Sequence, residues 1–196
     1  MGPLLEKLAI RDVIDNWVSW RDAGQFDRLR TTFHPDARFT ATWFDGPFSQ
    51  FVEASTAAWR RGSKSIHFLG GTTIDVVGNR AVAQTKMQIM VRAMVEGVEA
   101  DAVCNGRFYD RFEKRDGEWR IAIRSCIYEK SRIDPVEPGA KLVLDQALLD
   151  SFPEGYRHLV YIQAKNGASI TPNLATSRGP EIERLYELGR QWLDGK

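Results

Sequence analysis

Two polar residues in apolar surroundings are the strongest candidates for chemistry in this chain. Asp22 ends the stretch Trp17-Val18-Ser19-Trp20-Arg21-Asp22, and His67 follows 45 residues later in Ser65-Ile66-His67-Phe68. A carboxylate beside a histidine fixes the imidazole tautomer and stabilises the imidazolium that forms when the ring accepts a proton. The pair would be a small general acid–base system for near-neutral pH. The residues alone leave a second interpretation open, with His67 a core or edge-strand residue and Asp22 an exposed helix end.

The other reactive residue types give no competing site. His34 precedes Pro35 and is expected at the surface, whereas His158 lies on a helical segment where a structural role is expected. The three histidines show no metal-ligand spacing with one another, with cysteine or with acids, so we expect no metal site. The chain has no glycine-rich nucleotide-binding motif and no Gly-x-Ser-x-Gly elbow. We therefore expect chemistry without a cofactor.

Length and composition set the class of protein. A chain of 196 residues suits one domain, or one domain with an appendage. A net charge of +1 with scattered basic residues argues against nucleic acid or an anionic membrane as a partner. No apolar run approaches the roughly 20 residues that span a bilayer, and no signal peptide is evident. With only Cys104 and Cys126, no disulfide framework is expected, so we expect a cytoplasmic protein.

Hydrophobic periodicity and turn residues predict helices first and a long-stranded antiparallel sheet after them. Helices are expected over residues 4–23, 25–33 and 48–61, with a turn at 34–36, a strand over 38–44 and a turn at 45–47. Strands are expected over 65–77, 81–95, 98–114 and 118–133, because Gly78-Asn79, Glu96-Gly97 and Asp116-Gly117 are hairpin turns. Two further helices are expected over 155–166 and 180–193. This order predicts an α+β fold.

The last hairpin allows its strand register to be calculated. A two-residue loop at Asp116-Gly117 places Tyr109 opposite Arg124, Arg107 opposite Cys126 and Asn105 opposite Tyr128, on one side of the sheet. The apolar side would carry Phe108, Phe112, Trp119, Ile121, Ile123 and Ile127. A single bulge would exchange the two faces locally. Arg124 would then reach an interior pocket only if such a bulge exists, and otherwise it pairs with Asp110 or lies outside.

This order of elements, with several motifs, resembles the SnoaL-like families of the nuclear transport factor two superfamily. The motifs are residues 20–29 (WRDAGQFDRL), 33–37 (FHPDA), His67, 106–110 (GRFYD) and 115–121 (RDGEWRI). The resemblance implies a cone-shaped, curved antiparallel sheet closed by N-terminal helices. The cone domain would span residues 1–134, and a helical C-terminal extension over 135–196 would pack on the same domain or on a partner subunit.

The resemblance also implies roles for individual residues. Asp22 and His67 match the aspartate and general-base histidine of the scytalone dehydratase, bile-acid dehydratase and hexachlorocyclohexane dehydrochlorinase group, and Arg124 resembles a pocket arginine of some dehydrochlorinases. Trp17 stands where several of these enzymes have lysine or tyrosine, and tryptophan supplies neither a cation nor a phenolic proton. The aromatic residues expected in the core, which in a cone fold would also line a substrate pocket, are Trp17, Trp43, Phe44, Phe51, Phe68 and Phe108.

Two functions follow as expectations. The first is a cofactor-independent lyase or isomerase that acts on a small apolar cyclic compound through the His67–Asp22 pair, as in dehydratases. The alternative is a non-catalytic subunit or ligand-binding module, such as the small subunit of a ring-hydroxylating dioxygenase. Apolar residues on both faces of segment 81–95 and in the C-terminal helices also predict a homo-oligomer, a dimer in preference to a trimer.

Overall fold

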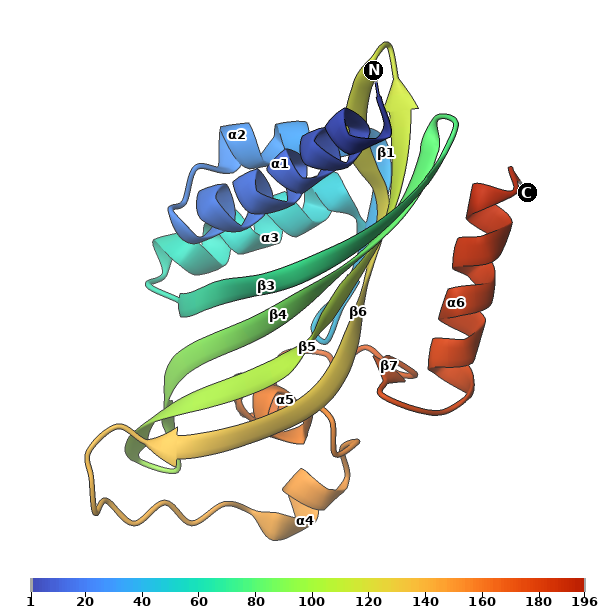
Figure 1. Cartoon of the computed structure of the whole chain (residues 1–196). Coiled ribbons are helices and arrows are strands. Elements are labelled where there is room, and N and C mark those ends of the chain that lie inside the picture. The colour runs from blue at the N-terminus through green and yellow to red at the C-terminus, as the bar shows by residue number, and fades with distance from the viewer. Residues whose placement is uncertain (1, 196) are drawn as a thin grey trace.

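The computed structural model describes residues 2–195 as a curved sheet with helices on both faces (Figure 1). The N-terminal elements are α1 (Pro3–Asp22), α2 (Phe26–Leu29), a 3-10 turn (Arg30–Thr32), β1 (Phe33–Ala41), β2 (Phe44–Pro47) and α3 (Phe48–Arg60). The long strands follow as β3 (Lys64–Val77), β4 (Arg80–Val95), β5 (Val98–Arg115) and β6 (Glu118–Pro135). The C-terminal elements are α4 (Gln146–Asp150), α5 (Arg157–Lys165), β7 (Ala175–Thr176) and α6 (Pro180–Leu193).

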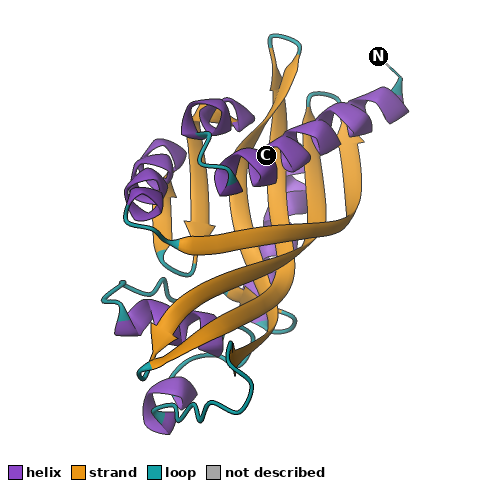
Figure 2. Cartoon of the chain, turned by 90° about the vertical axis from the view of Figure 1, so that its left-hand side faces the viewer, coloured by secondary structure: helices purple, strands orange, loops and turns teal. Residues whose placement is uncertain are grey.

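The sheet has the order β2-β1-β6-β5-β4-β3, with β7 beside β6. The four long strands are antiparallel, whereas β1 and β7 run parallel to β6. The strands curve strongly, and α1 crosses their concave side (Figure 2). The predicted α+β cone fold is therefore confirmed. None of the helices in the described part of the chain is long and apolar enough to span a membrane.

The two faces of the sheet are covered by different helices. On the concave side, residues of α1, α3 and α5 belong to one hydrophobic core, which includes Ile14, Val52 and Leu159. On the opposite side, α6 packs Ile182 and Leu185 against the sheet (Figure 1). Thus the C-terminal segment contacts both faces of the sheet of its own chain.

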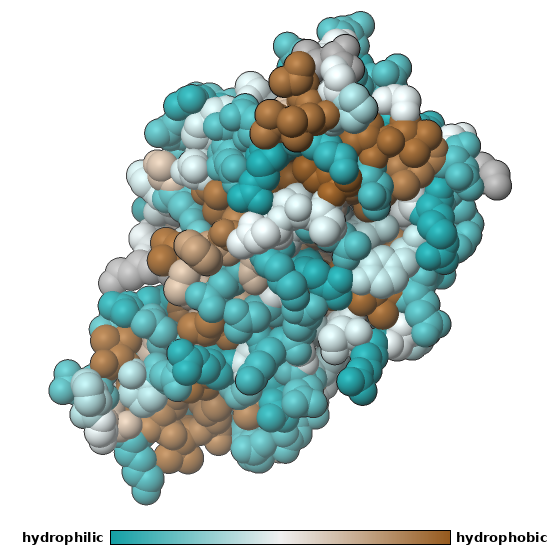
Figure 3. Space-filling view, in the orientation of Figure 1, coloured by the Kyte–Doolittle hydropathy of each residue, from teal (hydrophilic) through white to brown (hydrophobic). Residues whose placement is uncertain are grey.

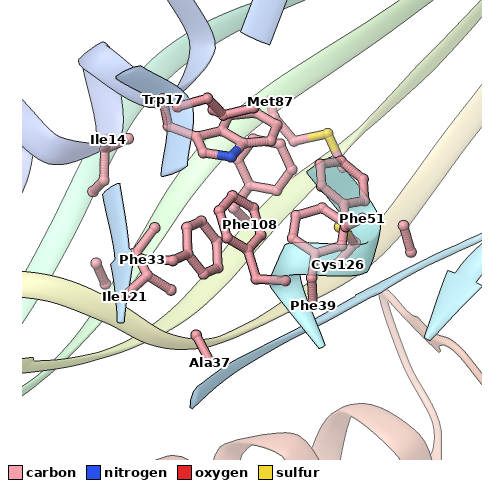
Figure 4. Close-up of a cluster of buried hydrophobic side chains, with 14 of the residues drawn as sticks. Ile14, Trp17, Phe33, Ala37, Phe39, Phe51, Met87, Phe108, Ile121 and Cys126 are labelled. Atoms are coloured by element: carbon pink, nitrogen blue, oxygen red, sulfur yellow. The ribbon is translucent and has the colours of Figure 1, made fainter. Parts of the chain in front are cut away.

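Aromatic side chains fill the concave core. Phe33 stacks on Phe48 with ring centroids 3.6 Å apart, and Phe39 stacks on Phe51 at 4.0 Å. Figure 4 shows the rings of Phe33, Phe39 and Phe51 gathered with Trp17 between α1, α3 and the strands. Burying an aromatic side chain of this size stabilises a fold by a few kcal/mol. This core fixes where α1 and α3 lie above the sheet.

The segment after α2 differs from the prediction. β1 begins at Phe33, so the predicted turn at His34-Pro35-Asp36 and the end of the predicted helix lie in a strand. Proline is accommodated because the pairing of β1 with β6 shifts register between Phe33 and Arg38, where Pro35 needs no ladder hydrogen bond. His34 is buried, not at the surface, and its Nε2 lies 2.9 Å from the carbonyl oxygen of Glu113.

The strand β2 is a second difference. The predicted turn Asp45-Gly46-Pro47 belongs to β2, which pairs with β1 from Arg38 to Ala41. Pro47 ends that strand and is the N-cap of α3. Proline is tolerated in edge strands, and the sheet order ends at β2.

Two bulges change the register that was calculated for the last hairpin. The calculated pairing holds from Arg115–Glu118 to Phe112–Ile121, and then Arg111 pairs with Ile123, which leaves Ala122 as an extra residue. Consequently Tyr109 faces Ser125, Arg107 faces Ile127 and Asn105 faces Lys130, so the three predicted pairs are wrong. The bulge turns Arg124, Cys126 and Tyr128 to the concave side, and it places Ile127 under α6.

The second bulge, at Glu129, depends on a glycine. Gly106 is the last residue before the register shifts again. A Cβ atom there would lie 2.1 Å from the carbonyl oxygen of Ile127, closer than any side chain can approach. The glycine thus permits the close contact of β5 with β6 that bends the sheet at this point.

Candidate active site

Asp22 and His67 lie together where the end of α1 meets β3. The Asp22 Oδ1 atom is 2.7 Å from Nδ1 of the imidazole, and Oδ2 accepts a hydrogen bond of 2.6 Å from the backbone N–H of His67. A carboxylate in contact with Nδ1 favours the tautomer that carries the proton there. Nε2 is therefore the ring nitrogen that can accept a proton. The two side chains are 19% and 9% exposed, so bulk water competes little with this pair.

Local sequence explains why the two residues meet. The helix α1 ends at Asp22, and Gly24 takes a left-handed conformation with φ of 69°. The Trp59 ring of α3 covers this glycine, where a Cβ atom would lie 2.6 Å from the ring. On β3 the side chains alternate, so His67 points inward while Ile66 and Phe68 are exposed. The glycine turn and the strand alternation together place the carboxylate against the imidazole.

His67 opens onto an apolar cavity of about 470 Å³. Such a volume is in the range of roughly 300–1,000 Å³ that is usual for small-molecule sites. Trp17 lies edge-on to the imidazole with ring centroids 5.4 Å apart, and Phe108 is at 6.4 Å. The further aromatic and aliphatic residues of the wall are Phe39, Ala41, Trp43, Phe51, Ala54, Ala57, Ala58, Ile89, Val91, Leu159, Ile162 and Ala168. The arrangement can hold an apolar ring beside a proton acceptor.

The polar part of the wall is basic. Arg21 and Arg61 line the cavity, together with Thr42, Ser63, Ser65, Cys126, Tyr128, Gln163 and Asn166. Arg21 is buried, and this burial lowers the pKa of its guanidinium, an effect that the nearby Asp22 carboxylate opposes. No aspartate or glutamate of the described residues lines this cavity.

Arg124 lies elsewhere in the core and does not line the cavity. Its Nε and Nη2 atoms donate to the two Asp110 oxygens at 2.6 and 2.7 Å, and both side chains are fully buried. The guanidinium carbon lies 4.3 Å from the Trp17 ring centroid and 4.1 Å from that of Phe108. The expected pocket role of Arg124 is therefore corrected to that of a buried ion pair beneath the rings that form the cavity wall.

The predicted aromatic lining is only partly present. Trp17, Trp43, Phe51 and Phe108 line the cavity. Phe44 does not, because it packs against the rings of Trp43 and Phe51 at 5.9 and 5.7 Å. Phe68 is 67% exposed, because it follows the inward-pointing His67 on an edge strand and so points away from the cavity.

Sequence reasoning missed two groups of wall residues. Arg21 is one helical turn after Trp17, and residues four apart on a helix share a face, so this residue could have been found. The residues of α5, among them Leu159 and Gln163, reach the cavity only through the path of the chain after β6, for which the sequence has no local signal. Among the described residues, no group of three or more His, Cys, Asp or Glu could hold a metal ion.

Comparison with known proteins identifies relatives of the whole chain. The SnoaL-like domain family matches residues 3–125. Pea pathogenicity protein 2 of Fusarium vanettenii is 32% identical over 203 residues, which cover 98% of this chain and 87% of that protein.

Solved structures resemble the chain in fold. A candidate scytalone dehydratase from Novosphingobium aromaticivorans aligns with a TM-score of 0.56 and 17% identity, over 72% of this chain and 95% of that chain. The beta subunit of a candidate aromatic-ring-hydroxylating dioxygenase from the same bacterium aligns with a TM-score of 0.53 and 18% identity, over 64% and 90%. At such identities the likeness concerns the fold alone.

Proposed function

This chain belongs to the SnoaL-like domain family of the nuclear transport factor two superfamily, and from this membership and the cavity we propose that it is a lyase or isomerase. It would act without a cofactor on a small, largely apolar cyclic compound. The observation that carries the proposal is the contact of 2.7 Å between Asp22 Oδ1 and Nδ1 of His67, whose ring borders the cavity. The candidate scytalone dehydratase of similar fold is consistent with this class of reaction.

The geometry supports a proton transfer through Nε2 of His67. This nitrogen would remove a proton from a carbon that is activated by a neighbouring carbonyl, and the C–H electron pair would pass into an enolate or a new double bond. In a dehydration, the leaving hydroxyl group takes the proton back from Nε2 and departs as water. In an isomerisation, the proton returns to a different carbon of the same compound.

Asp22 would hold the imidazole and stabilise its positive charge after the proton has been taken. Positioned acid–base catalysis contributes roughly a hundred- to ten-thousand-fold in rate. The aromatic wall would exclude water, which strengthens both the carboxylate–imidazolium attraction and any hydrogen bond to the developing oxyanion. A cavity with one proton acceptor and many apolar contacts suits this reaction.

A panel of hydroxylated cyclic ketones tests the proposal. Product formation would be followed by chromatography for the wild type and for His67→Ala, with Val77→Ala as the matched control at an exposed position of β3. We expect at least one compound to be converted by the wild type and the control but not by His67→Ala. Equal conversion by all three proteins on every compound that reacts would refute the mechanism.

The alternative is a non-catalytic module, because the beta subunit of a candidate dioxygenase has a similar fold. A module that only assembles with a partner needs neither an open cavity nor an oriented histidine. Here Trp17 leaves the cavity open, and Phe68 lies outside it, which supports the enzyme instead. Tight retention of panel compounds without any conversion would favour a ligand-binding module.

A further inference from the structure

Arg21 extends the core-facing stripe of α1 into the cavity. The buried residues of this helix are Ile10, Ile14, Trp17 and Arg21, which follow one another at spacings of four, three and four. These spacings put all four on a single helix face. Arg21 is 7% exposed and lines the cavity, so its charged end lies where the first three positions of the stripe carry apolar groups.

The surrounding residues satisfy the Arg21 guanidinium only in part. Its Nε has no hydrogen-bond partner among the residues that the structure describes. The adjacent carboxylate, Asp22, accepts from the backbone N–H and from Nδ1 of His67 through its two oxygens. An arginine stays protonated at any physiological pH, and a buried charge without a partner is costly. The Asp22 carboxylate thus compensates this cation through electrostatic attraction alone, and a group that enters the cavity can supply the missing hydrogen bond.

Two further groups on the wall would interact favourably with an anion. The indole N–H of Trp17, one turn before Arg21, is buried and also has no partner in the described chain. Arg61 brings a second positive charge to the wall, where no carboxylate of the described residues lies. The wall thus combines hydrogen-bond donors and positive charge with aromatic surface.

We propose that the ligand of this cavity carries an anionic oxygen group, such as a carboxylate, on its apolar ring frame and that Arg21 binds this group. The inference rests on the proposed function, because it takes the cavity as the substrate site, and it narrows the substrate class to cyclic acids. The planar guanidinium can donate two parallel hydrogen bonds to a carboxylate. An anion held there would share the cavity with His67.

Two fluorescent probes with a common ring frame test the proposal. The sulfonate of 8-anilinonaphthalene-1-sulfonate stands in for the carboxylate, whereas N-phenyl-1-naphthylamine lacks the charge. We expect the wild type to bind the anionic probe about tenfold to a hundredfold more tightly, as for hydrogen bonds to charged groups. Arg21→Gln should remove this preference and leave the affinity for the neutral probe within about twofold. Arg21→Lys should keep part of this preference, because lysine retains the charge but cannot donate two parallel hydrogen bonds from a planar group.

Controls separate this claim from stability and from catalysis. Arg190→Gln removes an exposed charge on α6, at the opposite face of the sheet, and should change neither affinity. If thermal melting shows that Arg21→Gln does not fold, Arg21→Met is used in its place. His67→Asn should keep the preference for the anion, so a failure of the proton-transfer mechanism would leave this result intact. Equal affinity of the wild type for both probes, or an unchanged preference in folded Arg21 variants, would overturn the proposal.

Discussion

Asp22 accepts hydrogen bonds through both carboxylate oxygens from one residue, His67. Oδ2 takes the backbone N–H at 2.6 Å, and Oδ1 contacts Nδ1 at 2.7 Å. The first bond ties the C-terminal end of α1 to β3, and the second orients the ring. A single carboxylate therefore joins the structural and the chemical parts of the site, so a change at Asp22 should affect both.

Asp22→Asn should lower both stability and turnover. The amide presents one acceptor oxygen where the carboxylate has two, so one donor of His67 loses its partner, at a cost of about 1–3 kcal/mol. Any turnover that depends on the imidazolium should fall by roughly a hundredfold or more. Urea unfolding and initial rates measure the two effects. Asp15→Asn, which alters the partly exposed ion pair of the same helix with Arg11, is the control. Full turnover in Asp22→Asn would contradict the role of Asp22.

The Asp110–Arg124 pair should act on stability. Removing one partner leaves a buried charge uncompensated, so Arg124→Met should cost about 3–5 kcal/mol of unfolding free energy. Replacing both residues, as Arg124→Met with Asp110→Leu, should recover much of that loss because no unpaired charge remains. Urea unfolding of the three proteins measures this. A single variant as stable as the wild type would contradict the structural assignment.

The features that could be predicted most reliably from the sequence are those that depend on neighbouring residues, such as hairpin turns. Glu96 and Asp116 take positive φ before Gly97 and Gly117, so the two hairpins could be placed from their turn residues. The bulge at Ala122 could not be predicted, because the position of an extra strand residue depends on how the sheet bends and not on local composition. That single residue turned Arg124 inward, opposite Asp110.

The candidate site shows the same division between local and long-range information. The resemblance to the SnoaL-like families paired Asp22 with His67, which helical periodicity alone left open. The outward position of Phe68 followed from strand alternation once His67 pointed inward, and was available from the sequence. The part of the wall formed by α5 could not be predicted from the sequence, because long-range packing brings Leu159 and Gln163 to the cavity.

The two cysteines should make the fold sensitive to alkali. Burial raises the pKa of Cys104 and of Cys126 from 9.0 to about 12. Because the folded pKa lies above the unfolded one, the stabilisation is fully present below about pH 9 and is lost as pH rises toward 12. Each thiol adds a slope of up to about 1.4 kcal/mol per pH unit. Urea unfolding at several pH values between 8 and 11 should show a shallower decline for Cys104→Ala with Cys126→Ala. Parallel slopes would contradict the burial effect.

We propose that the chain forms a homodimer, with a trimer as the alternative. The apolar residues of segment 81–95 suggested an interface. One of them, Val82, is covered by α6 of the same chain. Ile66 and Phe68 remain exposed on β3, at the end of the sheet order. Figure 3 shows a further group of hydrophobic side chains beside the start of α1, where Leu4, Leu5 and Leu8 are exposed.

Light scattering at micromolar concentration tests the assembly. The wild type should have about twice the chain mass of 22.3 kDa, because apolar side chains on an unpaired edge favour self-association. Phe68→Ser with Ile66→Thr should shift the mass toward the single chain, whereas Met94→Thr, at an exposed position of β4, should not. A wild-type mass near 22.3 kDa would end the proposal.

The central claim is that Nε2 of His67 removes a proton from a carbon atom in the cavity. The most direct measurement is the exchange of carbon-bound hydrogen for deuterium in D₂O, followed by NMR, on cyclic ketones that bind the protein. His67→Asn is the matched variant, because its amide nitrogen can replace Nδ1 toward Asp22 while Nε2 is lost. The account predicts exchange catalysed by the wild type and reduced by roughly a hundredfold or more in His67→Asn. Equal exchange in both proteins would contradict it.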